Sequence, residues 1–242
     1  MKQKMSDKKK IAALILAAGS GTRMGLGVTK QRLSINGKSL LKRSVEAFCA
    51  AELIDSVTVV TRADELDFVA GELDGIHKKY RGAVIGGKTR AESAACGFNS
   101  VCDGCDIVAI HDAARCLITP EMIDRVAIAA IEHGSATAAT RVTDTLKRAD
   151  GQGNVVTTVS RASLWSAQTP QMIATDIYRR GLALADHSDS EITDDNMIAE
   201  LAGASVRLVD TGRENIKITL GEDIGYAEYL LSKREKSGEE HS

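Results

Sequence analysis

The sequence predicts an α/β fold in which a mostly parallel β-sheet is flanked by helices on both faces. Short apolar segments alternate along the chain with segments of helical periodicity, which is typical of a parallel sheet with helical crossovers. The first apolar segment, residues 11–18, contains no polar residue, as expected for a strand that is buried on both faces. With 242 residues and 43% hydrophobic content, the chain is long enough for one large domain with a full core.

Regular alternation extends to about residue 140. Helices are predicted, from apolar residues at helical spacing, over residues 39–51, 64–73, 90–101 and 120–133. Thr119, Pro120 and Glu121 mark the start of the last one, because they supply an N-cap, a proline at the first helical position and an acid in the first turn. Strands are predicted over residues 57–61, 83–85, 106–110 and 136–140. Right-handed crossovers bring the carboxyl ends of parallel strands to one edge of the sheet, so we expect ligands to bind there.

The alternation is interrupted between Val142 and Gln171. Residues 157–159 have strand composition and residues 151–154 have the composition of a hairpin turn, but no helix follows. We therefore predict an arm over about residues 142–165 that leaves the domain and holds a partner subunit. A surface hairpin on a monomer is the alternative.

Beyond the arm, the chain returns to helices and a strand. We expect helices near residues 174–185 and 196–202, a strand at residues 206–209 and a terminal helix at residues 222–234. The whole is interpreted as a single domain, residues 1–242. Its folded core covers residues 10–235, with flexible ends at residues 1–9 and 236–242.

The loop after the first strand is the expected centre of the site. Gly19 and Gly21 let the backbone turn tightly and approach a ligand closely, and backbone N–H groups in such a loop make a nest for an anion. Arg23 and Lys30 add two positive charges beyond the glycines. The spacing matches neither G-x-G-x-x-G nor a P-loop, and a plain strand-to-helix linker is the alternative. We interpret the loop as a phosphate-binding site.

A carboxylate is predicted at the same edge of the sheet. Asp112 and Arg115 follow the strand at residues 106–110, in the motif H-D-A-A-R. Mg²⁺ favours one or two carboxylates plus substrate oxygens, so Asp112 is a candidate ligand for a Mg²⁺ ion that also binds phosphate. A helix cap or a turn residue is the alternative interpretation. The sheet, the phosphate loop and the acid together suggest nucleotidyl or phosphoryl transfer.

The composition argues against several classes of protein. The chain has 31 Lys and Arg against 33 Asp and Glu, a net charge of −2, which argues against nucleic acid as the main partner. No stretch approaches 18 apolar residues and no signal peptide is recognisable, so a cytoplasmic protein without membrane association is expected. The odd number of cysteines, five, fits reduced thiols. Cys102 and Cys105 form a C-x-x-C without a second pair, so a reduced pair is favoured over a zinc or redox site.

Seven motifs occur in order along nearly the whole chain. They are A-A-G-S-G-T-R-M-G with the following T-K-Q, G-G-K-T-R-A-E-S, H-D-A-A-R, D-T-L-K, S-R-A-S-L-W-S-A-Q-T-P-Q, T-D-D and N-I-K-I-T. The first resembles the signature loop of sugar-phosphate nucleotidyltransferases, and the set resembles the 2-C-methyl-D-erythritol 4-phosphate cytidylyltransferase family. The resemblance implies a Rossmann-like sheet of the nucleotide-diphospho-sugar transferase type. It also implies cytidylyl transfer from CTP to 2-C-methyl-D-erythritol 4-phosphate, with release of pyrophosphate, in the non-mevalonate route to isoprenoids.

The resemblance also implies roles for individual residues. Arg23, Lys30 and Lys217 would be catalytic, and the first two would neutralise the triphosphate. The nucleotide would be bound by Ala17, Ala18, Gly19, Gly21, Gly86, Arg90, Ser93 and Asp112. The sugar-alcohol phosphate would be bound by Asp112, Arg115, Thr145, Arg161 and Thr169, and Asp112 would also bind Mg²⁺. Because family members are homodimers, Thr145, Arg161 and Thr169 are implied to lie on an arm that crosses to the other subunit.

The sequence departs from the family pattern at four positions. Thr29 stands where proline commonly precedes the lysine, Arg32 where an aromatic residue is usual, and Cys116 and Arg141 each replace a proline. We hypothesise that Arg32 and Arg141 alter acceptor preference, and that Cys116, beside Arg115, is a reactive thiol with a lowered pKa. Two alternatives stay open: a cytidylyltransferase for another alditol phosphate, such as ribitol 5-phosphate, and a catalytically silent nucleotide-binding protein.

Overall fold

The computed structural model describes residues 8–19, 29, 32–185 and 191–239. The strands are β1 Ile11–Leu16, β2 Ser34–Ile35, β3 Lys38–Ser39, β4 Ser56–Thr61, β5 Tyr80–Ile85, β6 Ile107–Asp112, β7 Ser135–Arg141, β8 Leu146–Ala149, β9 Val155–Val159, β10 Trp165–Ala174 and β11 Arg207–Asp210. The α-helices are α1 Leu40–Ala50, α2 Leu66–Glu72, α3 Arg90–Val101, α4 Pro120–His133, α5 Thr175–Ala185, α6 Asp195–Leu201 and α7 Glu222–Glu239. Short 3₁₀ helices lie at η3 Ala63–Glu65 and η4 Cys102–Gly104.

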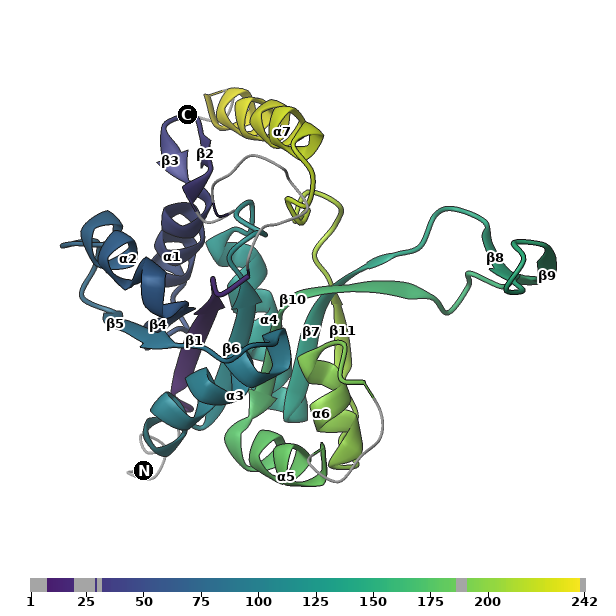
Figure 1. Cartoon of the computed structure of the whole chain (residues 1–242), viewed down its shortest axis with the longest axis horizontal. Helices are drawn as coiled ribbons and strands as arrows, with labels where there is room; N and C mark the ends of the chain where they lie inside the picture. Colours follow the sequence, from purple (N-terminus) through teal and green to yellow (C-terminus); the bar gives the residue numbers. More distant parts are fainter. Residues whose placement is uncertain (1–7, 20–28, 30–31, 186–190, 240–242) are drawn as a thin grey trace, which may run out of the picture.

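The central sheet of the described residues has seven strands, in the order β11-β7-β10-β6-β1-β4-β5 (Figure 1). Strand β10 runs antiparallel to its neighbours β6 and β7, whereas the other pairs in this sheet are parallel. The predicted mostly parallel sheet is therefore confirmed. The carboxyl ends of β1, β4, β5 and β6 lie at one edge of the sheet, which is the edge where a parallel fold binds its ligands.

Helices cover both faces of the sheet, and β1 contributes apolar side chains to both. Its residues Ile11, Ala13 and Ile15 belong to a core cluster with α1, α2 and α4. Leu14 and Leu16 belong to the cluster with α3, α5 and α6 on the opposite face. Successive side chains of a strand point to opposite faces, so a strand covered on both sides has to be apolar throughout.

Local sequence explains several element boundaries. Helix α4 has the predicted bounds, and the Thr119 hydroxyl accepts a hydrogen bond from the Met122 N–H at its start. Asn36 and Gly37 both have positive φ angles, 47° and 74°, and join β2 to β3 in a two-residue turn. The Asn-Gly pair favours such a hairpin, but we had not predicted one there.

Strand β10 is the largest difference from the predicted fold. We expected the segment up to Gln171 to lie outside the repeat of the sheet, but Trp165–Ala174 is inserted between β6 and β7. The hairpin of β8 and β9 does project from the domain, as the arm was predicted to do (Figure 1). The terminal helix, α7, was expected to end near Arg234 and runs to Glu239. None of the described helices combines the length and the apolar character needed to cross a bilayer.

Candidate functional site

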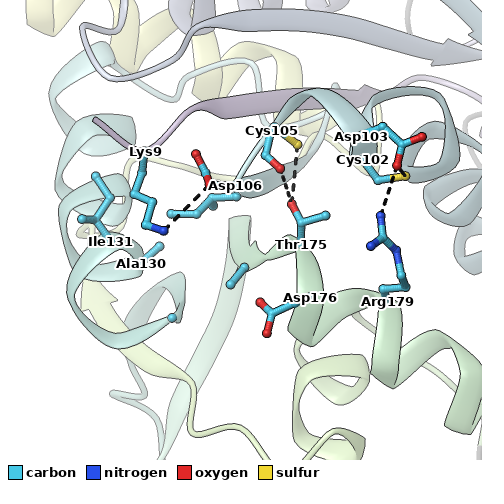
Figure 2. Close-up of a pocket in the computed structure, with 13 residues that line it drawn as sticks. Lys9, Cys102, Asp103, Cys105, Asp106, Ala130, Ile131, Thr175, Asp176 and Arg179 are labelled. Atoms are coloured by element: carbon cyan, nitrogen blue, oxygen red, sulfur yellow. Dashed lines mark hydrogen bonds and ion pairs between the residues drawn. The ribbon is translucent and has the colours of Figure 1, made fainter. Parts of the chain in front are cut away.

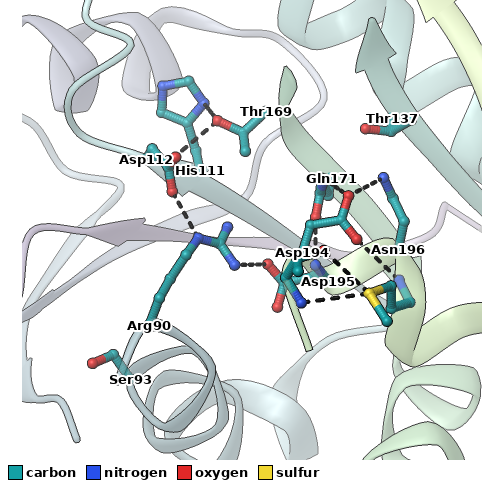
Figure 3. A network of polar contacts seen from close by, with 12 residues as sticks. Arg90, Ser93, His111, Asp112, Thr137, Thr169, Gln171, Asp194, Asp195 and Asn196 are labelled. Carbon is teal, nitrogen blue, oxygen red and sulfur yellow. Dashed lines mark hydrogen bonds and ion pairs between the residues drawn. The ribbon is translucent and has the colours of Figure 1, made fainter. Parts of the chain in front are cut away.

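The polar residues that the sequence placed at the carboxyl edge of the sheet meet around one carboxylate. Asp112 ends β6, Arg90 begins α3, and Lys217 lies in the loop between β11 and α7. Arg90 Nε donates to Asp112 Oδ1 at 3.1 Å, and Lys217 Nζ donates to Asp112 Oδ2 at 2.6 Å. Figure 3 shows the Arg90–Asp112 contact within a larger polar network. The Lys217–Asp112 ion pair brings together positions that are 105 residues apart in the sequence.

Asp112 is ionised in this setting. It is only 8% exposed, and burial alone would raise the pKa of its carboxyl group. The positive charges of Arg90 and Lys217 outweigh that effect and hold the pKa of Asp112 well below its usual range. The same carboxylate raises the pKa of Arg90, together with Asp195, against the effect of burial. The site therefore holds fixed charges of both signs.

His111 and Thr169 support Asp112 from behind. The Thr169 hydroxyl accepts a hydrogen bond from the Asp112 N–H at 3.1 Å and lies 3.0 Å from His111 Nδ1. The His111 ring packs on Phe48, with the ring centroids 4.8 Å apart. Burial lowers the pKa of the imidazole to about 3, so the ring is neutral. The motif H-D-A-A-R thus combines a buried structural histidine with a carboxylate at the edge of the site.

Burial of His111 predicts a loss of stability in mild acid. Burial lowers the pKa of this imidazole to about 3, whereas the unfolded chain takes up the proton near pH 6.5. Between these two values the unfolded state binds more protons, so the free energy of unfolding should fall by up to about 1.4 kcal/mol per pH unit as the pH drops. Urea denaturation at pH 7, 6 and 5 measures this slope.

The His111 slope has a matched control. His111→Asn should flatten the pH dependence between pH 7 and 5, whereas replacing the exposed His133 by Gln should leave it unchanged. Equal slopes in the protein and in His111→Asn would contradict the assignment.

The glycine turn after β5 depends on close packing. A Cβ atom on Gly86 would lie 2.7 Å from Ser93 Oγ, so only glycine fits between β5 and α3. The Ser93 hydroxyl donates to the Thr89 carbonyl at 2.8 Å and holds this turn together. At the end of β1, the Ala17 N–H donates to the Val60 carbonyl at 2.7 Å. Ala18 and Gly19 follow directly at the carboxyl edge.

The loop that carries Lys217 is anchored by Asn215. The Asn215 side-chain amide donates to Gln168 Oε1 at 3.0 Å and to the Thr169 carbonyl at 2.9 Å. Arg115 Nη1 donates to the Asn215 carbonyl at 3.0 Å, and the charge of Arg115 also interacts with that of Asp112. The predicted residues Arg90, Asp112, Arg115, Thr169 and Lys217 therefore lie in one connected network.

Other predicted site residues are not part of this network. Gly21, Arg23 and Lys30 lie outside the described residues. Thr145 and Arg161 are exposed on the projecting arm (Figure 1), and Arg161 Nη1 donates to the Thr143 carbonyl. Thr169 was implied to lie on the arm, and that placement is wrong. It lies in β10, inside the sheet, because the strand returns from the arm between β6 and β7.

The structure gives contacts for three of the four departures from the family pattern. The Arg32 Nε donates to Glu65 Oε2 at 2.8 Å, and its guanidinium lies 4.5 Å from the centre of the Phe68 ring. The Thr29 hydroxyl donates to the other oxygen of the same buried carboxylate at 3.1 Å. Arg141 lies over the ring of Trp165, at 4.4 Å. Both arginines thus have partners within the chain.

Cys116 does not have the environment expected of a reactive thiol. It is 4% exposed and belongs to the apolar cluster under α7. Burial raises the pKa of its thiol to about 11, against the weaker opposing effect of Arg43. The hypothesis of a lowered pKa is therefore wrong, because the side chain points into the core and not toward Arg115.

Thiol labelling tests this correction. At pH 8 an alkylating reagent should modify the exposed Cys96 rapidly, whereas Cys116 and the buried Cys49 should react only after denaturation. Peptide mapping by mass spectrometry, in buffer and in 6 M guanidinium, measures both rates. Rapid labelling of Cys116 in buffer would contradict its burial.

A separate cavity of about 540 Å³ lies at the opposite edge of the sheet, around Cys102, Cys105 and Arg179 (Figure 2). The thiol of Cys105 lies 3.6 Å from the Thr175 hydroxyl, and burial raises the pKa of that thiol. In the part of the chain that the structure describes, no cluster of three or more Cys, His, Asp or Glu side chains could hold a metal ion.

Asp112 is compatible with a Mg²⁺ ion that takes most of its ligands from water and substrate phosphates. Its ionised oxygens each bind one cationic side chain, and a carboxylate has about four acceptor positions, so one further ligand position remains on each oxygen. A single carboxylate suits Mg²⁺ only when water and substrate phosphates supply the remaining ligands. The residues present thus fit a metal that arrives with a phosphate ligand.

Sequence reasoning missed residues that the network depends on. Asp195 and Tyr178 are buried and hydrogen bonded to each other at 2.7 Å, and Asp195 also binds Arg90. Asp195 is the last residue of the motif T-D-D, and the motif by itself indicates no role for it. In a sequence, a buried aspartate at the start of a helix has the same pattern as an ordinary N-cap. The sequence therefore did not predict that Asp195 binds Arg90.

Comparison with known proteins shows similarity over nearly the whole chain. The family described as IspD, 2-C-methyl-D-erythritol 4-phosphate cytidylyltransferase, matches residues 11–233. The enzyme of that name from Synechococcus sp. CC9902 is 41% identical over 226 residues, which cover 91% of this chain and 97% of the relative. The bifunctional enzyme IspD/IspF of Rhodopseudomonas palustris is 39% identical, and the match covers 94% of this chain. This chain spans only 57% of the length of that relative.

Solved structures give the same result. The crystal structure of 4-diphosphocytidyl-2C-methyl-D-erythritol synthase from Anaerococcus prevotii has a TM-score of 0.84 at 27% identity, covering 93% of this chain and 97% of the other. The 2-C-methyl-D-erythritol 4-phosphate cytidylyltransferase of Thermus thermophilus has a TM-score of 0.72 at 29% identity and covers 91% of this chain. Both similarities cover more than nine tenths of this chain.

Proposed function

The chain belongs to the 2-C-methyl-D-erythritol 4-phosphate cytidylyltransferase family, and we propose on that basis that it transfers the cytidylyl group of CTP to 2-C-methyl-D-erythritol 4-phosphate. A phosphate oxygen of the acceptor attacks the α-phosphorus of CTP. The bond from that phosphorus to the bridging oxygen breaks, and pyrophosphate leaves. The product is 4-diphosphocytidyl-2-C-methyl-D-erythritol, an intermediate of isoprenoid synthesis by the non-mevalonate route.

One observation carries this proposal: three cationic side chains surround Asp112 at the carboxyl edge of the sheet. Arg90 and Lys217 bind its two oxygens, and Arg115 lies within electrostatic range. Both substrates are anions, so bringing them together requires positive charge that is fixed in place before reaction. Lys217 is the most exposed of these three cations, with 44% of its side chain accessible. It is therefore the most accessible to an incoming phosphate.

The other predicted residues complete the proposed site. Arg23 and Lys30 stabilise the triphosphate, and Ala17, Ala18, Gly19 and Gly21 line the nucleoside. Gly86, Arg90 and Ser93 close the nucleotide pocket. Asp112 and Arg115 contact the acceptor phosphate, and Thr169 supports Asp112 from behind.

Mg²⁺ and a homodimer are part of the proposal. Asp112 would hold Mg²⁺ together with phosphate oxygens of CTP, and the ion supplies further neutralisation of charge. Thr145 and Arg161 lie next to β8 and β9, the hairpin that projects from the sheet in Figure 1, and they bind the acceptor in the site of the partner subunit. We also propose a cytoplasmic location, because an odd number of cysteines fits reduced thiols.

Pyrophosphate release tests the function directly. The protein is incubated with CTP and Mg²⁺, and 2-C-methyl-D-erythritol 4-phosphate and ribitol 5-phosphate are offered in parallel. We expect turnover with the first acceptor, and its loss in Lys30→Ala. The exposed Lys78 at the other edge of the sheet provides the matched control Lys78→Ala, which should retain full activity.

The two acceptors separate the possible failures. Turnover with ribitol 5-phosphate alone would keep the chemistry but overturn the acceptor. CTP binding without turnover of either acceptor would indicate a nucleotide-binding protein without activity.

A further inference from the structure

Asp195 binds Arg90 through a different nitrogen from the one that binds Asp112. The proposed function gives Asp195 no contact with a substrate. It begins α6 and is 2% exposed. Its Oδ2 accepts from Arg90 Nη1 at 2.8 Å and its Oδ1 accepts from the Tyr178 hydroxyl at 2.7 Å. Figure 3 shows Asp195 on one side of the Arg90 guanidinium and Asp112 on the other. A buried carboxylate with two such partners is a fixed point in the site.

Three elements hold Asp195 in place. Its backbone N–H donates to Gln171 Oε1 of β10 at 2.7 Å, and Gln171 Nε2 donates to Asp194 at 2.9 Å. Tyr178 of α5 packs against Phe98 of α3, with ring centroids 4.8 Å apart. Since Arg90 begins that same α3, the helix that carries the arginine and the helices that carry its partners form one packed unit.

The contacts of Arg90 leave part of its guanidinium available. Of the five N–H donors of an arginine, one at Nε is directed to Asp112 and one at Nη1 to Asp195. Nη2 makes no hydrogen bond to any residue that the structure describes. The side chain is 31% exposed, so the remaining donors are accessible to a ligand. Phosphate and carbonyl oxygens of a nucleotide are suitable acceptors.

Asp195 also fixes the orientation of the Arg90 guanidinium relative to Asp112. Lys217 already occupies Oδ2 of Asp112. With Asp112 as its sole anion, the guanidinium would be free to rotate about the single Nε contact. A second carboxylate on Nη1 prevents this rotation, because the planar fork is then fixed at two points.

We propose that Asp195, supported by Tyr178, is a positioning residue that orients Arg90 for CTP. The inference rests on the proposed function, since it assigns a role in binding the nucleotide of that reaction. Asp195 contributes no contact of its own to the substrate and acts through Arg90. The motif T-D-D thereby gains a reason beyond capping α6.

The test compares two carboxylates of α6. Asp195→Asn removes the charge that holds Arg90, whereas Glu200→Gln removes an exposed carboxylate from the last turn of the same helix, which has no contact with Arg90. For Asp195→Asn we expect KM for CTP to rise about tenfold or more, the range for the loss of one charge-assisted hydrogen bond. KM for the acceptor should stay within about twofold. Glu200→Gln should leave both KM values unchanged.

A double-mutant cycle distinguishes positioning from general support of the fold. Arg90→Met keeps the aliphatic stem but removes the charge. In that background Asp195→Asn should have no further effect on KM for CTP, because the guanidinium through which Asp195 acts has been removed. An equal rise in both backgrounds, or no rise in either, would overturn the proposal.

Two further measurements keep the test decisive. If Asp195→Asn does not fold, Tyr178→Phe takes its place, with a smaller rise in KM for CTP that also disappears beside Arg90→Met. A rise that persists there would overturn the proposal. Calorimetric measurement of the dissociation constant for CTP repeats the same cycle without turnover. If the unaltered protein has no activity, that result counts against the proposed function. The dissociation constants of the variants then decide the role of Asp195.

Discussion

Replacing Asp112 by asparagine should lower kcat for pyrophosphate release by about 100-fold or more. The carboxylate binds Arg90 and Lys217 at 3.1 and 2.6 Å, and an amide retains the shape but not the charge. Without that charge the two cations repel each other and lose their orientation toward the phosphates. Loss of one pre-organised electrostatic partner typically reduces kcat by about 10²–10³-fold.

The Asp112 prediction has a pH check. Because the pKa of Asp112 is held below its usual range, the carboxylate stays charged at every pH above about 4. The deficit of Asp112→Asn should therefore be the same at pH 6 and pH 9. Asp176→Asn removes an exposed partner of Arg180 on α5 and should retain activity, since surface pairs of this kind contribute little. A 100-fold deficit in both variants, or a deficit confined to one end of the pH range, would contradict the assigned role.

Gly181→Ala should destabilise the fold by about 2 kcal/mol or more. Gly181 lies in α5 where it crosses α6, and an added Cβ atom would lie 2.0 Å from the Ile198 carbonyl oxygen. The obstacle is backbone, so the two helices must move apart, and overpacking of this kind costs roughly 1–3 kcal/mol or more. An alanine in a helix is otherwise favourable, which makes the sign of the result informative.

Gly225→Ala is the matched control for that substitution. Gly225 lies in α7, and an added Cβ atom would meet no atom within 4 Å. This variant should gain about 0.5–1 kcal/mol from higher helix propensity. Urea denaturation of both variants measures the difference. Similar midpoints for Gly181→Ala and Gly225→Ala would show that α5 and α6 are not held together as the structure indicates.

The Gly181 substitution also connects packing to the site. Helix α6 begins with Asp195, which binds Arg90. If α6 moves away from α5, the Tyr178–Asp195 hydrogen bond is strained as well. CTP binding by Gly181→Ala should therefore weaken together with its stability.

Features of the site with a local cause were predictable from the sequence. Asp112 ends an apolar strand, so its place at the carboxyl edge follows from strand direction. The Thr119-Pro120-Glu121 signal was sufficient for the start of α4, because capping involves only neighbouring residues. Cys116 shows the limit of such reasoning. Its neighbour Arg115 suggested a reactive thiol, but burial under α7 raises its pKa to about 11.

The sequence by itself determined the α/β class, the edge that carries the site and membership of a nucleotidyltransferase family, because apolar alternation and ordered motifs are written along the chain. Only the tertiary structure decided that β10 enters the sheet antiparallel and that Thr169 lies behind Asp112. It alone revealed that Asp195 holds Arg90 across 105 positions of sequence. The physical reason is that strand insertion and the pairing of buried charges depend on partners distant along the chain, and no local pattern specifies them.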